Sequence, residues 1–138
     1  MIEINNKAGF DIDLKKTRRV VEKFLDYYKF KDYKISIALI DDEEIREINK
    51  NYRGLDSITD VLSFSSSEKE KKEENFLGEI LINYNQTKRQ ASSFNHTPWE
   101  EFVFILIHGL LHLLGYDDST KKDKEKMVSL GEEFIRKI

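Results

Sequence analysis

Two histidines and one aspartate near the end of the chain have the spacing of a metal-binding site. His108 and His112 are four residues apart in an apolar segment. At 3.6 residues per turn their imidazoles project roughly 40° apart on one helix face. Gly115 can adopt the left-handed conformation that ends a helix, so Asp118 can fold back toward the same point. Two imidazoles and one carboxylate leave a coordination position open. The pattern H-x3-H-x2-G-x2-D therefore predicts a catalytic metal site.

Each of these residues also has a simpler interpretation. A histidine on an apolar helix is usually a hydrogen-bonded core residue, and Asp118 could be the N-cap of a following helix. The metal site is favoured because two histidines at positions i and i+4 occur together with a helix-ending glycine and an acid. His96 lies roughly 18 Å from His108 along the helix axis. We therefore interpret it as a surface or capping residue that does not share the metal.

Gly109 argues against one well-known use of such a metal. Zinc peptidases with the related signature H-E-x-x-H-x-x-G-x-x-H use the glutamate as a general base. In this chain the corresponding position is Gly109, which has no side chain, so a peptidase mechanism is disfavoured. A metal alone can lower the pKa of bound water to about 7. That chemistry suits a phosphodiester, provided that another group neutralises the phosphate.

Arg53 is the candidate for that second group. It stands in the segment Asn51-Tyr52-Arg53-Gly54, which we place between a helix and a strand. A guanidinium presents a fixed fork of donors that matches phosphate oxygens. The alternative is an ordinary solvated arginine in a loop, and the residue type alone does not separate the two.

Strands and helices that alternate along the chain must position these residues. Alternating or β-branched apolar residues predict four strands, over residues 2–5, 34–40, 60–64 and 77–83. Helical spacing and capping signals predict five helices. The first begins at Leu14 with Asp13 as N-cap, and the next three cover about Asp42 to Asn49, 84–94, and Pro98 to about Leu114. The last helix has Met127, Leu130, Phe134 and Ile138 on one face.

The helix that begins at Pro98 is the most clearly marked element. Thr97 has the position of its N-cap, and Glu100 has that of the acid in a capping box. Apolar residues cover nearly its whole circumference, so we expect it to be buried. The polar run over residues 65–75 predicts a loop or hairpin tip. Together the elements predict an α+β single domain over residues 1–138, with about five helices packed on a mixed four-stranded sheet.

Composition limits the kinds of protein that this chain can be. Its 138 residues suit one domain. It has no cysteine, so any metal ligands must be His, Asp or Glu. The N-terminal segment lacks the apolar stretch of a signal peptide. The longest apolar run has six residues, whereas a membrane span needs about 20. We therefore expect a cytoplasmic protein without a membrane segment.

The charge of the chain gives a weaker indication. Its formal net charge of −3 argues mildly against generic nucleic-acid binding, which depends on neutralising phosphates. Two local clusters of cations occur nonetheless: Lys15, Lys16, Arg18 and Arg19, and farther on Lys88 and Arg89. The simpler interpretation of both clusters is a solvated helix face.

The segment around the histidine pair resembles a known family. Residues 108–118, HGLLHLLGYDD, resemble the signature H-G-x-L-H-L-x-G-Y-D-H of the YbeY family, metal-dependent endoribonucleases described as ribosomal RNA maturation factors. Upstream, Tyr52-Arg53, TDVLSF over 59–64 and LGEI over 77–80 resemble the family's Y-R, T-D-V-L-S-F and L-G-D-I blocks in the same order. The resemblance covers over half of the chain. It departs at four positions: Asp118 for His, Glu79 for Asp, and Ile58 and Ser65 where proline is common.

The resemblance implies a metal-dependent single-strand endoribonuclease that acts in rRNA maturation and small-subunit ribosome biogenesis. It implies His108 and His112 as metal ligands, Asp118 at the third ligand position and Arg53 as an active-site arginine. One divalent ion is expected, Zn²⁺ by the resemblance, although the harder carboxylate of Asp118 favours Mn²⁺ or another transition metal. The expected partner is RNA, namely rRNA of the small ribosomal subunit. The alternative is a ribosome-associated assembly factor with weak nuclease activity, in which the metal mainly orders the C-terminal turn.

Overall fold

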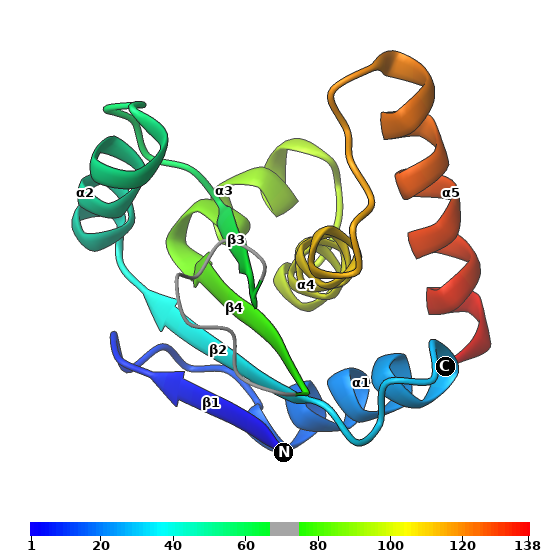
Figure 1. Cartoon of the computed structure of the whole chain (residues 1–138). Helices are drawn as coiled ribbons and strands as arrows, with labels where there is room; N and C mark the ends of the chain where they lie inside the picture. Colours follow the sequence, from blue (N-terminus) through cyan, green and yellow to red (C-terminus); the bar gives the residue numbers. More distant parts are fainter. Residues whose placement is uncertain (67–74) are drawn as a thin grey trace.

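A four-stranded mixed sheet forms the centre of the computed structural model, which describes residues 1–66 and 75–138 (Figure 1). The strands are β1 (Ile2–Asn6), β2 (Lys34–Ile40), β3 (Val61–Ser65) and β4 (Phe76–Asn83). They lie in the order β1-β2-β4-β3. β1, β2 and β4 are parallel, and β3 pairs with β4 in the antiparallel direction. The predicted mixed sheet is therefore confirmed.

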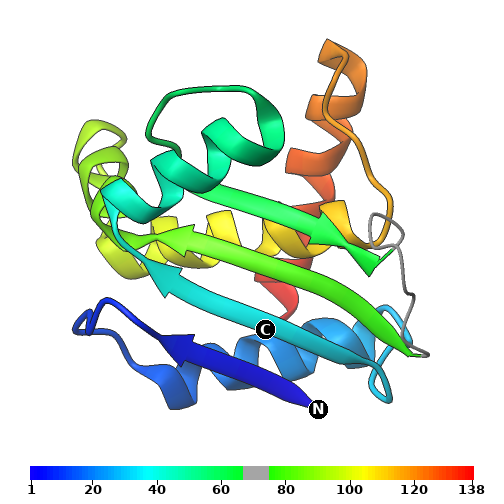
Figure 2. The same cartoon turned by 60° about the vertical axis from the view of Figure 1, so that its left-hand side comes forward.

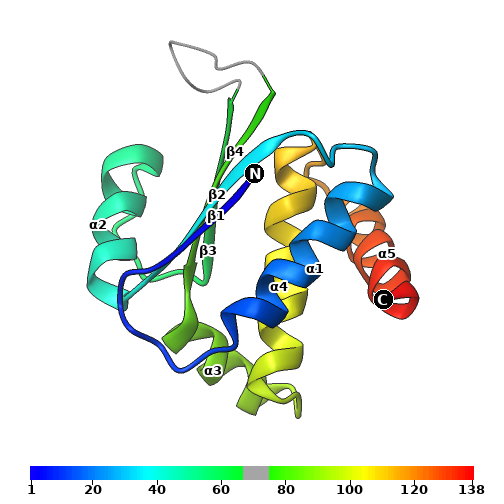
Figure 3. The same cartoon turned by 90° about the horizontal axis from the view of Figure 1, so that it is seen from below.

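Five helices in the described ranges pack on this sheet or on one another. They are α1 (Leu14–Tyr27), α2 (Asp42–Arg53), α3 (Tyr84–Ser93), α4 (Pro98–Leu113) and α5 (Lys121–Lys137). α2 lies on one face, and α1 and α4 lie on the other with α5 beyond them (Figure 2; Figure 3). The predicted α+β fold with five helices is confirmed. None of these helices combines the length and the apolar character needed to cross a membrane.

α4 carries the histidine pair and lies in the core. The Thr97 hydroxyl accepts a hydrogen bond from the Glu100 backbone N–H at 3.1 Å, and the Glu100 carboxylate accepts one from the Thr97 N–H at 2.9 Å. This is the predicted capping box. Most of the helix is buried against the sheet and the outer helices, with Phe102 and Leu106 fully buried. Packing on several sides therefore fixes the direction in which the histidines project.

The second helix extends farther than predicted. The helix expected to end near Asn49 continues for one more turn to Arg53, because Gly54 adopts the left-handed conformation (φ +72°) that ends it. Arg53 is therefore the last residue of a helix, and its placement in a loop was wrong. Of the polar run over residues 65–75, residues 67–74 lie outside the described residues, so a loop there stays a prediction.

Candidate metal centre and its groove

Three donor atoms from His108, His112 and Asp118 converge where α4 ends. The Nε2 atoms of the two histidines are 3.1 Å apart. Oδ2 of Asp118 lies 3.2 Å from Nε2 of His108 and 3.5 Å from Nε2 of His112. All three residues are half-buried. Within the described ranges, these three side chains form a group whose ligand atoms are close enough together to hold a metal ion.

A backbone carbonyl fixes the tautomer of His112. Nδ1 of His112 lies 3.0 Å from the carbonyl oxygen of Tyr116. Because a carbonyl oxygen only accepts hydrogen bonds, Nδ1 carries a proton, and in the neutral tautomer Nε2 then presents its lone pair. Tyr116 reaches this position because the chain turns back at Gly115, where φ is +101°. The turn that ends the helix therefore also orients one donor of the group.

The chemistry of the three donor atoms fits a divalent cation. A neutral His108 with its proton on Nε2 could donate to either neighbouring acceptor, whereas a divalent cation would be bound by all three atoms at once. Burial, and then the neighbouring His112, lower the pKa of His108 although Asp118 acts in the opposite direction. The imidazolium form of His108 is therefore disfavoured near neutral pH, which leaves the ring in the neutral form that binds metals. Tetrahedral ligands about 2.1 Å from zinc lie roughly 3.4 Å from one another, close to the separations observed. This group could hold a metal ion.

The simpler interpretation of Asp118 as a helix cap is wrong. The N-cap of α5 is Thr120, whose hydroxyl accepts a hydrogen bond from the Asp123 N–H at 3.0 Å. The preceding acid, Asp117, is engaged locally, because it accepts the Asp118 N–H at 2.8 Å and the Ser119 hydroxyl at 2.7 Å. The Ser119 hydroxyl is the main reason that the pKa of Asp117 is lowered. Asp117 thus shapes the turn, while Asp118 points at the histidines.

The packing of α4 explains why a glycine follows His108. A Cβ atom at Gly109 would lie 3.2 Å from Cγ2 of Ile80 and 3.2 Å from Oγ of Ser63. Oγ of Ser63 also donates a hydrogen bond to the Gly109 carbonyl at 3.2 Å. A side chain here would therefore press against the sheet. The position that holds the general base in the zinc peptidases is tightly packed in this protein, and a larger residue there would require Ile80 and Ser63 to move.

We predict that Gly109→Glu lowers the free energy of unfolding by about 3 kcal/mol or more, because it buries an unpaired charge in a packed contact. Urea unfolding followed by circular dichroism would measure the change. The matched control is Gly131→Ala in α5, where a new Cβ would make only an ordinary contact of 3.5 Å with Ile107. Alanine in that helix interior should be neutral or stabilise by up to about 1 kcal/mol. Wild-type stability of Gly109→Glu would contradict the packing argument.

A groove of about 820 Å³ joins the three donor atoms to Arg53, since all four side chains line it. Nη2 of Arg53 donates a hydrogen bond to the Ser63 carbonyl at 2.8 Å. The guanidinium carbon lies 4.5 Å from the centre of the Phe64 ring. β3 therefore holds Arg53 at the groove. The structure thus brings the predicted site residues together, although Arg53 is far from the others in the sequence.

Two acids to which the sequence analysis gave no role also line the groove. Glu101 is only 4% exposed. Nε2 of Gln90 donates to both Glu101 and Asp60, at 3.1 Å each. Nδ1 of His96 lies 3.3 Å from Glu101, so His96 contacts an acid and lies outside the group that could hold a metal ion. Glu101 precedes His108 by seven residues, or two helical turns, so the helical periodicity could have revealed it.

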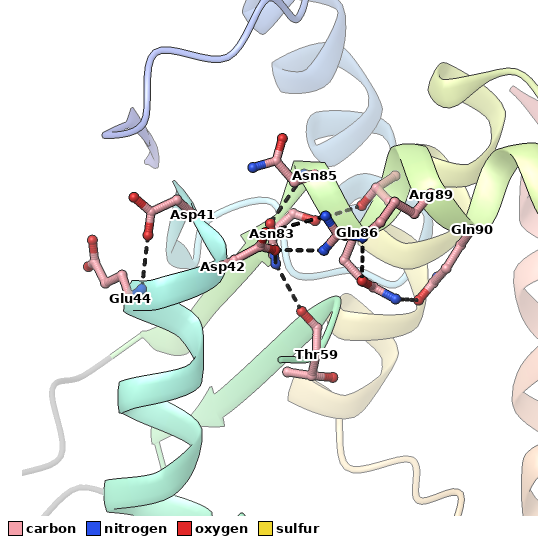
Figure 4. Close-up of polar contacts among 10 residues, drawn as sticks. Asp41, Asp42, Glu44, Thr59, Asn83, Asn85, Gln86, Arg89 and Gln90 are labelled. Atoms are coloured by element: carbon pink, nitrogen blue, oxygen red, sulfur yellow. Dashed lines mark hydrogen bonds and ion pairs between the residues drawn. The ribbon is translucent and has the colours of Figure 1, made fainter. Parts of the chain in front are cut away.

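A chain of hydrogen bonds fixes the orientation of Gln90 (Figure 4). Arginine can only donate, and Nε of Arg89 donates to Oε1 of Gln86 at 2.9 Å. Nε2 of Gln86 must then donate to Oε1 of Gln90, at 3.2 Å, which leaves Nε2 of Gln90 for the two acids. Arg89 also pairs with Asp42 at 2.7 Å and lowers the pKa of that carboxyl. The acidic wall of the groove is therefore positioned by both α2 and α3.

The chain is similar to known proteins over nearly its whole length. The family model described as Endoribonuclease YbeY matches residues 2–138. An Endoribonuclease YbeY from Persephonella marina is 41% identical over 140 residues, which cover 99% of this chain and 92% of the relative. Another from Bacillus velezensis is 38% identical over 128 residues, covering 83% and 82%. The solution structure of TM1509 from Thermotoga maritima has a TM-score of 0.67 at 30% identity, covering 98% of this chain and 87% of that one.

Proposed function

This chain belongs to the YbeY family of endoribonucleases, and from that premise we propose that it cleaves single-stranded RNA with the help of one divalent metal ion. The observation that supports the proposal is the single groove that brings Arg53 to the donor atoms of His108, His112 and Asp118. We further propose rRNA of the small ribosomal subunit as the substrate and the cytoplasm as the place of action. The support for both is the resemblance to rRNA maturation factors.

We propose that His108, His112 and Asp118 are the metal ligands. When bound, the metal would supply Lewis acidity and lower the pKa of water toward about 7. The two histidines contribute neutral nitrogen ligands, and the carboxylate of Asp118 makes the set harder than three imidazoles would be. We therefore propose Zn²⁺ or a harder ion such as Mn²⁺.

Arg53 is proposed to bind the phosphate at the point of cleavage. A guanidinium is cationic at every relevant pH and can donate two parallel hydrogen bonds to phosphate oxygens. The Ser63 carbonyl and the Phe64 ring restrict how its side chain can turn, so part of the entropic cost of orienting it is already met by the fold. The carboxylates of Asp60 and Glu101 repel a phosphate. The phosphate is therefore expected beside Arg53 and not beside the two acids.

Arg53→Ala should keep the fold and the metal but lower the rate of RNA cleavage by about a hundredfold or more, the usual cost of removing one preorganised donor to developing charge. The measurement is the cleavage rate of a labelled single-stranded RNA, beside the metal content by elemental analysis. Arg46→Ala is the matched control, because Arg46 lies on the same helix, pairs with the exposed Asp56 and does not line the groove. Wild-type cleavage by a metal-loaded Arg53→Ala protein would remove Arg53 from the mechanism.

One assay tests the proposed function as a whole. The purified protein is incubated with labelled RNA and with casein, in the presence and absence of a chelator. We expect RNA cleavage that the chelator abolishes, and intact casein under both conditions. Absence of RNA cleavage, together with binding to small ribosomal subunits that survives chelation, would support the assembly-factor alternative instead.

A further inference from the structure

A second groove, of about 570 Å³, adjoins the first. It is lined by side chains of α1, α4 and α5, among them the cations Lys16, Arg19 and Lys23 and the aromatic rings of Trp99 and Phe104. Phe104 lines both grooves. The two grooves therefore share this side chain as part of their walls.

The three cations form a row along α1. Lys16, Arg19 and Lys23 are three and then four residues apart, so they share one face of the helix and extend over roughly 10 Å at 1.5 Å per residue. None of them forms an ion pair within residues 1–66 and 75–138, whereas Lys7 and Arg46 do. Neighbours at this spacing lie about 5–6 Å apart at their Cβ atoms. The row therefore offers three positive charges to the phosphates of a strand.

The groove combines a cation with an aromatic ring. Trp99 is half-buried, and Nζ of Lys16 lies 4.7 Å from the centre of its ring. Cations beside aromatic side chains form the arrangement with which proteins bind single strands without reading their sequence. Two acids also line the groove, Glu100 and Glu132. The carboxylate of Glu100 already accepts the Thr97 N–H at the start of α4.

We propose that this second groove binds the part of the RNA strand that extends beyond the cleaved phosphate. The proposal rests on the proposed function, because it needs a single-stranded RNA in the first groove. The cation row supplies charge complementarity to the phosphates, and Phe104 links the groove to the site of cleavage. An acidic protein segment is the other polyanion that would fit the charges. The shared Phe104 favours the strand that already occupies the neighbouring groove.

The test compares two variants with the same change in charge. The first is Lys16→Gln/Arg19→Gln/Lys23→Gln, and the control is Lys15→Gln/Lys34→Gln/Lys122→Gln, whose residues do not line the groove. Binding to unstructured RNAs of about 4 and about 16 nucleotides is followed by the fluorescence of Trp99, the only tryptophan. Chelated protein keeps the RNA intact during this measurement. Cleavage of both RNAs is then measured with metal present, and circular dichroism verifies the fold.

We expect the groove variant to bind the long RNA about tenfold or more weakly and to lower the slope of log affinity against log salt by about two, since each single-strand contact contributes about 0.7. Cleavage of the short RNA should equal that of the wild type, and the control should match the wild type throughout. Equal losses of affinity for the long RNA in both variants, or no loss in either, would overturn the inference. A Trp99 response to polyglutamate but not to RNA would also overturn it, in favour of a protein partner. Failure of the wild type to cleave the short RNA would instead contradict the proposed function.

Discussion

His112→Ala is expected to lose stoichiometric metal, with an affinity at least about a hundredfold below that of the wild type, and His108→Ala should do the same. Changing a residue that merely orients a metal ligand costs roughly 10–100-fold, and removal of a ligand should cost more. Both Nε2 atoms belong to one triangle with Oδ2 of Asp118, so neither has a substitute nearby among the described residues. The fold should survive, because both side chains are partly exposed.

Elemental analysis of the purified proteins measures this loss, and thermal unfolding with and without added metal provides a second reading. Metal at about 100 times its dissociation constant stabilises a folded protein by about 2.7 kcal/mol, and this gain should vanish in both variants. His96→Ala is the control, because His96 contacts Glu101 and lies outside the group. Full metal content in either His108→Ala or His112→Ala would show that the site is wrongly placed.

Asp118→Ala is expected to weaken metal binding by orders of magnitude without changing the stability of the metal-free protein by more than about 0.5 kcal/mol. The two effects separate because Thr120, and not Asp118, caps α5. Asp118→His should restore metal binding, since it gives three imidazoles, and should shift the preference toward Zn²⁺ because imidazole is a softer ligand than carboxylate.

Competition with a chromogenic chelator, for several metals, measures these affinities. Asp117→Ala is the matched control, because Asp117 shapes the turn through hydrogen bonds to the next two residues and should cost only the roughly 10–100-fold of an indirect partner. Metal binding by Asp118→Ala as tight as that of the wild type would assign the third ligand position elsewhere.

The parts of the site that follow from local rules could be predicted from the sequence. The capping box at Thr97 and the position of Pro98 fixed the start of α4, and the four-residue spacing placed both histidines on one face. The turn at Gly115 was expected, and it does bring Asp118 back to the histidines. Each of these features depends on a few neighbouring residues, so a sequence pattern is enough to indicate it.

The parts that depend on tertiary contacts could not be predicted in this way. The approach of Arg53 to the candidate metal ligands requires β3 to pair with β4 and α4 to pack on both, which no local pattern specifies. The shared amide of Gln90 between Asp60 and Glu101 joins three elements. The end of α2 is a different case, because Gly54 is a local signal that marks it in the sequence.

The candidate metal ligands all come from one segment of eleven residues, 108–118, whereas Arg53 joins them from the far side of β3. Closing the short segment costs little entropy, but bringing Arg53 to it requires the long-range pairing of the sheet. The two halves of the site can therefore form at different stages of folding. A chain that has formed α4 and its turn, but has not yet paired β3, could bind metal and still be unable to hold a phosphate. The metal content of a preparation is then an upper bound on its fraction of competent enzyme, and titration of active sites is needed to count the molecules that can turn over.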